Sequence, residues 1–222
     1  MKNEEIVLAS ASPRRRELLA LFELPYRSLS ADLDESQLPG EAPTEYVQRL
    51  ALQKGQAIKS DGLVISADTI VVFEGKVLGK PANASEAQQM LAGLRGKQHN
   101  ALTALVLQQP GNGMLLQDVC TTNVQMRDYS DAEMEAYIQS GDYRDKAGGY
   151  AIQHQAFHPV AAIQGCYANV MGLPLCNLTC LLQAAGVSVA VNIPEACQHH
   201  LGITCAVYPE ILARCAEVSQ PH

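Results

Sequence analysis

SADTIVVFEGKVLGKP, residues 66–81, predicts a β-hairpin that carries two charges a hairpin does not need. The apolar, β-branched run TIVVF indicates a strand, EG is a turn pair, and KVL is a short return strand. Asp68 stands where the first strand is expected to begin, and Lys80 stands where its partner ends, directly before a proline. Neither charge is required by the hairpin itself, so the rest of the chain must account for them.

Strand and helix patterns alternate on both sides of this hairpin. Further strands are expected at residues 6–9, 100–107, 118–126, 160–163 and 168–172. Helices are expected after Ser12, with Pro13 as the first helical residue, from Thr44 to about Lys59, from Asn83 to Gly96, from Ser130 to Gly141, and between Pro174 and Gly186. This order predicts an α/β protein with a mixed, twisted sheet flanked by helices. The last 36 residues, 187–222, are interpreted as a C-terminal extension of the domain at residues 1–186.

Composition excludes several classes of function. The chain has 222 residues, of which 47% are hydrophobic and 18% charged, and its net charge is −7. This charge, with the absence of tryptophan, argues against nucleic-acid binding, and no segment has the roughly 20 apolar residues of a membrane helix. The acidic start MKNEE does not resemble a signal peptide, and seven cysteines without a CxxC pair favour reduced thiols. A cytoplasmic protein is therefore expected.

Four basic residues occupy positions where local structure disfavours a positive charge. Arg14, Arg15 and Arg16 lie in the first turn of a predicted helix, where the helix dipole disfavours positive charge. An anion bound at the helix N-terminus would account for them, although they could also face solvent or nearby acids. Lys54 falls on the apolar stripe of its helix, so it must either extend to solvent or meet an acid or a phosphate.

Carboxylates complete this unusual set. Asp32, Asp34 and Glu35 share one loop, where a solvated acidic turn is the ordinary explanation, and Asp68 comes from a separate segment. Two carboxylates from separate segments can also bind Mg²⁺ together with phosphates and water. Taken together, the arginines, lysines and carboxylates fit phosphoryl chemistry on a nucleotide.

Five motifs follow one another along the chain: LASASPRRRELL, SADTIVVFEGKVLGKP, LRGKQHNALTALVL, DKAGGYAIQ and NVMGLPL. In order and spacing they resemble the Maf family of nucleoside triphosphate pyrophosphatases. The resemblance implies a cytoplasmic homodimer that uses Mg²⁺ or Mn²⁺ to hydrolyse a nucleoside triphosphate to its monophosphate and pyrophosphate. It also implies a fold with two lobes around a cleft, related to the inosine triphosphate pyrophosphatases.

The same resemblance assigns roles to individual residues. It implies Asp68 as the catalytic proton acceptor, and Glu35 matches the acid of the loop after the first helix. We expect Glu35 and Asp68 to be the metal ligands. The implied phosphate-binding residues are Ser10, Arg14, Arg15, Lys54 and Lys80. The implied specificity residues are Arg14, Thr69 and Gln153, and the amide of Gln153 suits the edge of a pyrimidine ring. The form DKAGGYAIQ resembles the branch that prefers dTTP and UTP.

The sequence is also compatible with another substrate and with another class of function. His154 stands where the family has glycine, so a modified purine nucleotide such as 7-methyl-GTP is an alternative substrate. A nucleotide-binding regulator of septum formation is an alternative from another class, but the presence of Asp68 and Lys80 favours an enzyme. Cys197, His199, His200 and Cys205 in the extension match no standard zinc spacing, and two short helices that pack on the domain or on a dimer partner are expected there.

Overall fold

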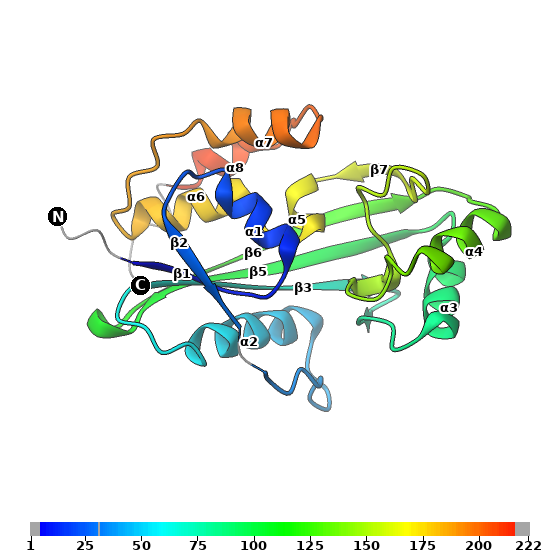
Figure 1. Cartoon of the computed structure of the whole chain (residues 1–222), viewed down its shortest axis with the longest axis horizontal. Helices are drawn as coiled ribbons and strands as arrows, with labels where there is room; N and C mark the ends of the chain where they lie inside the picture. The colour runs from blue at the N-terminus through cyan, green and yellow to red at the C-terminus, as the bar shows by residue number, and fades with distance from the viewer. Residues whose placement is uncertain (1–4, 31, 216–222) are drawn as a thin grey trace.

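One seven-stranded mixed sheet organises the chain, of which the computed structural model describes residues 5–30 and 32–215 (Figure 1). Its strands are β1 (Ile6–Ala9), β2 (Tyr26–Leu29), β3 (Leu63–Phe73), β4 (Lys76–Leu78), β5 (Gln98–Gln109), β6 (Met114–Met126) and β7 (Val160–Gln164). The order is β2-β1-β3-β5-β6-β7, and β4 pairs with β3. β1 is parallel to β2 and β3, whereas the other pairs are antiparallel. The α/β prediction with a mixed sheet is confirmed.

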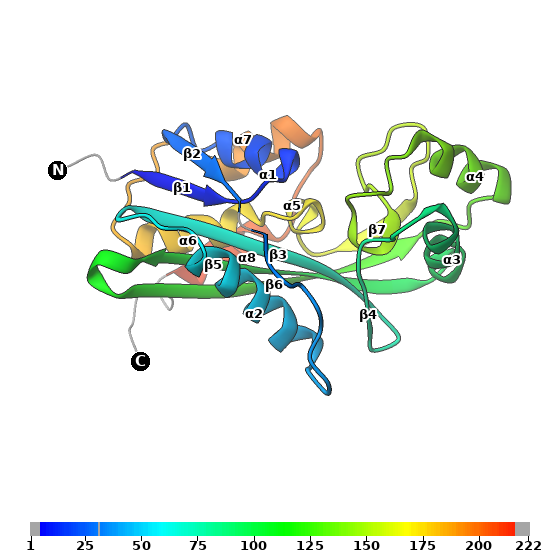
Figure 2. The ribbon, with the colours of Figure 1, turned by 60° about the horizontal axis from the view of Figure 1, so that its bottom comes forward.

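Helices cover both faces of this sheet. They are α1 (Pro13–Ala20), α2 (Pro43–Gln56), α3 (Ala84–Leu94), α4 (Asp131–Ser140), α5 (Tyr167–Met171), α6 (Leu175–Ala184), α7 (Ile193–Leu201) and α8 (Tyr208–Ala213), with 3₁₀ turns η1 (Pro110–Asn112) and η2 (Ala147–Gly149). Figures 1 and 2 show α2 on one side of β3 and β5, and α1, α5 and α6 on the other. The elements α3, α4 and β7 gather at the far end of the sheet from β1 and β2 (Figure 2).

The hairpin of residues 66–81 forms as predicted, but its first strand is longer than expected. Glu74 and Gly75 both have positive φ, 50° and 76°, as a two-residue turn between right-twisted strands requires. β3 begins at Leu63, so Asp68 lies in the middle of the strand and not at its start. The hairpin pattern does not reveal this earlier start, because the first part of β3 pairs with β1, a parallel strand far away in the chain.

Most helix ends follow the local capping signals. The side chains of Ser12, Asn83 and Ser130 accept hydrogen bonds from the backbone N–H groups three residues later, and Gly141 ends α4 with φ of 78°. Thr44 does not cap α2, because that helix already begins at Pro43. Caps are local interactions, which explains why sequence patterns predict them well.

Two short segments differ from the expected structure. Residues 168–172, expected as a strand, instead belong to the helix α5 and its terminating Gly172, and α5 packs against β5 and β6. The strand β2 was not expected, since YRSL has no apolar run and only partly buried side chains.

Residues 187–215 of the C-terminal extension pack on the domain, as expected, and residues 216–222 lie outside the described part. α7 and α8 both contact α6, and Cys197 and Ile211 are buried. Cys180 on α6 and Cys215 after α8 form a disulfide, so the expectation of reduced thiols is wrong for this pair. The other five cysteines are free thiols.

No helix within residues 5–30 and 32–215 has the length and apolar character needed to cross a membrane.

Candidate active site

A pocket of about 310 Å³ opens where one edge of β3 has no partner. β1 pairs with β3 only as far as Ile65, and β4 pairs with it only from Val71 onwards. In the described part of the chain, no strand pairs with this edge between those two residues. Asp68 and Thr69 lie in the gap and line the pocket. A change of strand partner of this kind is a common ligand site in α/β sheets.

This pocket collects most of the site residues that the sequence predicted. Those that line it are Ser10, Arg14, Arg15, Glu35, Lys54, Asp68, Thr69 and Lys80. Gln153 is exposed and is not among the lining residues. The roles of all these residues stay predictions.

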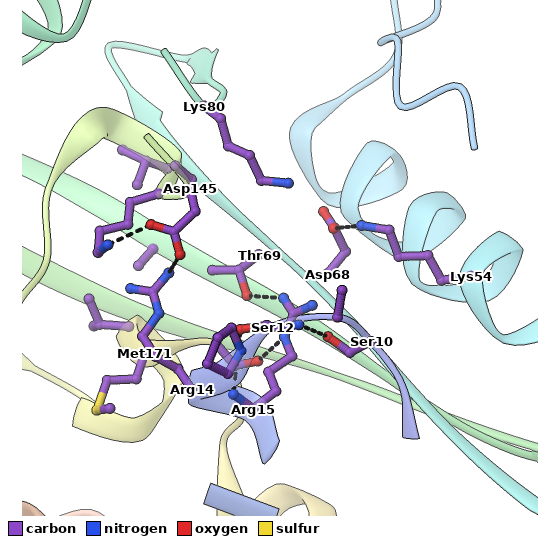
Figure 3. A pocket seen from close by; sticks show the side chains of 18 of the residues that line it. Ser10, Ser12, Arg14, Arg15, Lys54, Asp68, Thr69, Lys80, Asp145 and Met171 are labelled. Atoms are coloured by element: carbon purple, nitrogen blue, oxygen red, sulfur yellow. Dashed lines mark hydrogen bonds and ion pairs between the residues drawn. The ribbon is translucent and has the colours of Figure 1, made fainter. Parts of the chain in front are cut away.

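Lys54 joins the two predicted metal ligands at one end of the pocket. Its ammonium contacts Asp68 Oδ1 (Figure 3). It also lies 2.7 Å from Glu35 Oε1, while Lys80 Nζ lies 3.7 Å from Glu35 Oε2. Side chains alternate along β3, so Asp68 and Ser66 point to the face that carries α2, where the Ser66 hydroxyl donates to Ala51 O. Lys54 therefore meets an acid, one of the two outcomes expected from its place on the apolar stripe.

Lysine contacts control the charge of Glu35. Partial burial alone would raise the pKa of Glu35, but hydrogen bonds and charges from Lys54 and Lys80 outweigh it, so the pKa lies below its ordinary value. Glu35 is consequently an anion at neutral pH.

Arg15 is fixed on the opposite face of the sheet. Its Nε donates to Gly172 O at 2.8 Å and its Nη2 donates to Thr69 Oγ1 at 2.9 Å. Burial lowers the pKa of Arg15, although the negative charge of Asp68 opposes this effect. Arg16 instead donates to Ala11 O and does not line the pocket, so only two of the three first-turn arginines do.

A chain of hydrogen bonds from Thr69 through Thr103 to Asn169 holds the hydroxyl that accepts from Arg15. The Thr103 hydroxyl donates to Asn169 O at 3.0 Å, and Thr69 Oγ1 lies 2.9 Å from Thr103 Oγ1. Because the single hydroxyl hydrogen of Thr103 points to Asn169, the Thr69 hydroxyl must donate to Thr103. The oxygen of Thr69 is thereby oriented to accept from Arg15.

We expect Thr103→Val to lower kcat/KM about tenfold, because Thr69 loses its acceptor and the hydroxyl that holds Arg15 is no longer oriented. A tenfold loss corresponds to about 1.4 kcal/mol of transition-state stabilisation. Thr103→Ser should restore activity. The matched control is Thr179→Val, which removes a buried hydroxyl that donates to Leu175 O within α6. Wild-type kcat/KM in a folded Thr103→Val enzyme would contradict the argument.

Asp145 and Lys146 form the other end of the pocket, and sequence reasoning missed both. Lys146 Nζ lies 2.5 Å from Asp145 Oδ1, and Arg14 Nη2 lies 3.9 Å from Asp145 Oδ2. Both residues belong to the motif DKAGGYAIQ, so the motif was the available signal. Figure 3 shows Asp145 and Arg14 on one side of the pocket, and Asp68 and Lys54 on the other.

His154 does not face this pocket. Its Nδ1 accepts a hydrogen bond from Phe157 N at 2.9 Å, its ring packs edge-on against Tyr137, and its Nε2 lies 3.6 Å from Asp142. The argument for a modified purine substrate depended on His154 and loses that support.

Glu35 and Asp68 fit a divalent cation that is also bound by substrate. Their carboxylates contact one ammonium, so their oxygens lie close to a common point. Mg²⁺ commonly takes one or two carboxylates together with water and phosphate oxygens. Among the described residues, no group of three or more His, Cys, Asp or Glu side chains could hold a metal ion. A cation at Glu35 and Asp68 would therefore need oxygens from substrate and water.

The chain is similar to known proteins over most of its length. The family model described as "Maf-like protein" matches residues 5–185. The chain is 45% identical over 183 residues to a dTTP/UTP pyrophosphatase of Anaeromyxobacter dehalogenans, covering 82% of this chain and 94% of that protein. It is 41% identical over 189 residues to a dTTP/UTP pyrophosphatase of Geobacter sp. strain M21, covering 84% and 98%. The Ham1 protein of Staphylococcus aureus is similar in structure with a TM-score of 0.41 and 14% identity, covering 56% of this chain and 73% of that chain.

Proposed function

The chain belongs to the Maf family, and from this premise we propose that it hydrolyses dTTP and UTP to the nucleoside monophosphate and pyrophosphate. Relatives that bear this activity in their names match it over nearly their whole length. The observation that carries the proposal is the Lys54 ammonium between Asp68 and Glu35, in the same pocket as Arg14 and Arg15. This combination suits a triphosphate and a reaction that moves a proton.

In the proposed reaction Asp68 accepts a proton from a water molecule whose oxygen attacks the α-phosphorus. The bond from the α-phosphorus to the bridging oxygen breaks, and pyrophosphate leaves with that oxygen. Arg15 and Lys80 neutralise the charge on the leaving group. Glu35 and Asp68 would hold Mg²⁺ or Mn²⁺, which when bound supplies further positive charge to the phosphates.

Product analysis tests the proposed function directly. With Mg²⁺ or Mn²⁺, the protein should release monophosphate and pyrophosphate from dTTP and UTP faster than from CTP, ATP, GTP or 7-methyl-GTP. Orthophosphate as the product would contradict the reaction, and a purine preference would contradict the substrate assignment. Nucleotide binding without turnover would favour the regulatory alternative.

We expect Glu35→Gln to raise the Mg²⁺ concentration needed for half-maximal activity about tenfold or more, since a neutral amide is a weaker ligand than a carboxylate. A titration of initial rate against free Mg²⁺ measures this. Asp34→Asn is the matched control, because Asp34 lies in the same loop but bonds Ser36 and does not line the pocket. An unchanged Mg²⁺ requirement in Glu35→Gln would remove Glu35 from the metal site.

Assembly and location complete the proposal. A homodimer and a cytoplasmic location follow from the family resemblance, and residues 187–222 are proposed as an extension of the catalytic domain. Sedimentation of the full chain tests the dimer.

A further inference from the structure

Asp145 is an accessible carboxylate held between two cations. Its side chain is 59% exposed, whereas the side chains of Lys146 and Arg14 are only 10% and 19% exposed. One carboxylate oxygen faces Lys146 at 2.5 Å, and the other faces Arg14 at 3.9 Å. The order along this end of the pocket is therefore donor, acceptor, donor.

The surroundings of this array suit a flat ring better than a phosphate. Val71, Ala147 and Tyr150 line the same pocket, and Val71 lies directly beside Gly148, so these side chains adjoin Lys146. The Tyr150 hydroxyl lies 2.7 Å from His99 Nε2, which fixes the position of its ring. Burial lowers the pKa of His99 to about 4, so this partner is uncharged at neutral pH. An apolar wall thus stands next to the three charged groups.

From this arrangement we infer that Lys146, Asp145 and Arg14 read the base of the nucleotide. Uracil and thymine present an acceptor, a donor and an acceptor in a row, namely O4, N3–H and O2, which complements the array. Cytosine presents an amino donor towards Lys146 and the lone pair of N3 towards Asp145, so two of its three groups mismatch. Guanine and 7-methylguanine end in the N2 amino donor, which would meet the guanidinium of Arg14. This inference rests on the proposed function and supplies a reason for its substrate preference.

Charge keeps Asp145 a pure acceptor. Partial burial would raise the pKa of Asp145, but the hydrogen bond and charge of Lys146 and the charge of Arg14 lower it below its ordinary value. A site built to bond a particular donor discriminates against an analogue that lacks it. The Asp145 carboxylate would face the lone pair of cytosine N3, which repels it. Gln153 is exposed and does not line the pocket, and its part in reading the base stays a prediction. In this inference the base is read by the array.

The test compares kcat/KM for UTP and CTP in the wild type and in Asp145→Asn. The amide of asparagine can donate to N3 of cytosine, so the UTP-to-CTP ratio should fall at least tenfold. Asp142→Asn is the matched control, because Asp142 is a nearby exposed carboxylate that faces His154 and does not line the pocket. Its ratio should equal that of the wild type.

A second measurement on the wild-type enzyme avoids any effect of the substitution on folding. N3-methyl-UTP lacks the N3–H donor, whereas 5-methyl-UTP keeps the whole edge, so the first should be hydrolysed at least tenfold less efficiently than the second. Equal efficiency for the two, or an unchanged UTP-to-CTP ratio in Asp145→Asn, would overturn the inference while leaving the pyrophosphatase activity in place. Failure of the wild type to hydrolyse any pyrimidine triphosphate would instead overturn the proposed function, and the inference with it.

Discussion

Asp68→Asn should lower kcat for UTP by about 10³-fold, within the range that positioned proton acceptors contribute. Asp68 is only 6% exposed and lies on the open edge of β3, in the pocket that also contains the arginines. Asparagine has nearly the same shape, so packing is preserved while the proton acceptor and one metal ligand are lost. Initial rates of pyrophosphate release at saturating nucleotide and Mg²⁺ measure the effect.

The contacts of Lys54 allow the effect of Asp68→Asn on catalysis to be separated from an effect on nucleotide binding. Lys54 still has Glu35 at 2.7 Å after the change, so its charge stays paired. Binding of a UTP analogue with a non-hydrolysable α,β-bridge should therefore remain within a few-fold of the wild type. Asp118→Asn serves as the control, since Asp118 lies on β6 and accepts from Asn177, outside the pocket. Retention of more than a tenth of the activity in Asp68→Asn would exclude Asp68 as the proton acceptor.

Sequence reasoning predicted the parts of the fold that depend on neighbouring residues. The turn at Glu74-Gly75 and the caps at Ser12 and Ser130 need only a few adjacent residues, and each formed as expected. The beginning of β3 and the strand β2 depend on parallel pairing with β1, which leaves no turn signal between the partners. The disulfide joins cysteines 35 positions apart and exists because α8 packs on α6, which no local spacing reveals.

The site residues also fall into those that local sequence predicts and those that only the fold brings together. Arg15 and Lys54 were conspicuous because each places a charge where local structure disfavours it, at a helix N-terminus and on an apolar stripe. Asp145 lies in a polar loop, where an acidic residue is ordinary and gives no sign of a special role. Only the fold brings it near Arg14. The sequence therefore predicted the cations and carboxylates at β3 and missed the acceptor at the other end of the pocket.

Arg15→Lys should lower kcat/KM about 100-fold even though the formal charge is kept. Arg15 anchors itself through two different nitrogens, to Gly172 O and to Thr69, and still has N–H groups left for a phosphate. Lysine has one nitrogen, which cannot reach both anchors and also hold a geometry suited to two phosphate oxygens. Arg16→Lys is the control, because Arg16 follows in the same turn of α1 but lies outside the pocket.

The pH dependence of the Arg15→Lys enzyme separates loss of geometry from loss of charge. Burial lowers the pKa of Arg15, and arginine starts so high that it stays protonated. A lysine at the same buried position starts about two units lower and experiences the same penalty, so its charged form is lost as the pH rises. Residual activity of Arg15→Lys should therefore fall relative to the wild type as the pH rises from neutral towards the ordinary pKa of lysine, whereas Arg16→Lys should follow the wild-type profile. A 100-fold loss that does not change with pH would mean that the lysine remains charged and that only the two-anchor geometry was lost. Wild-type activity at every pH would show that Arg15 does not act on the triphosphate.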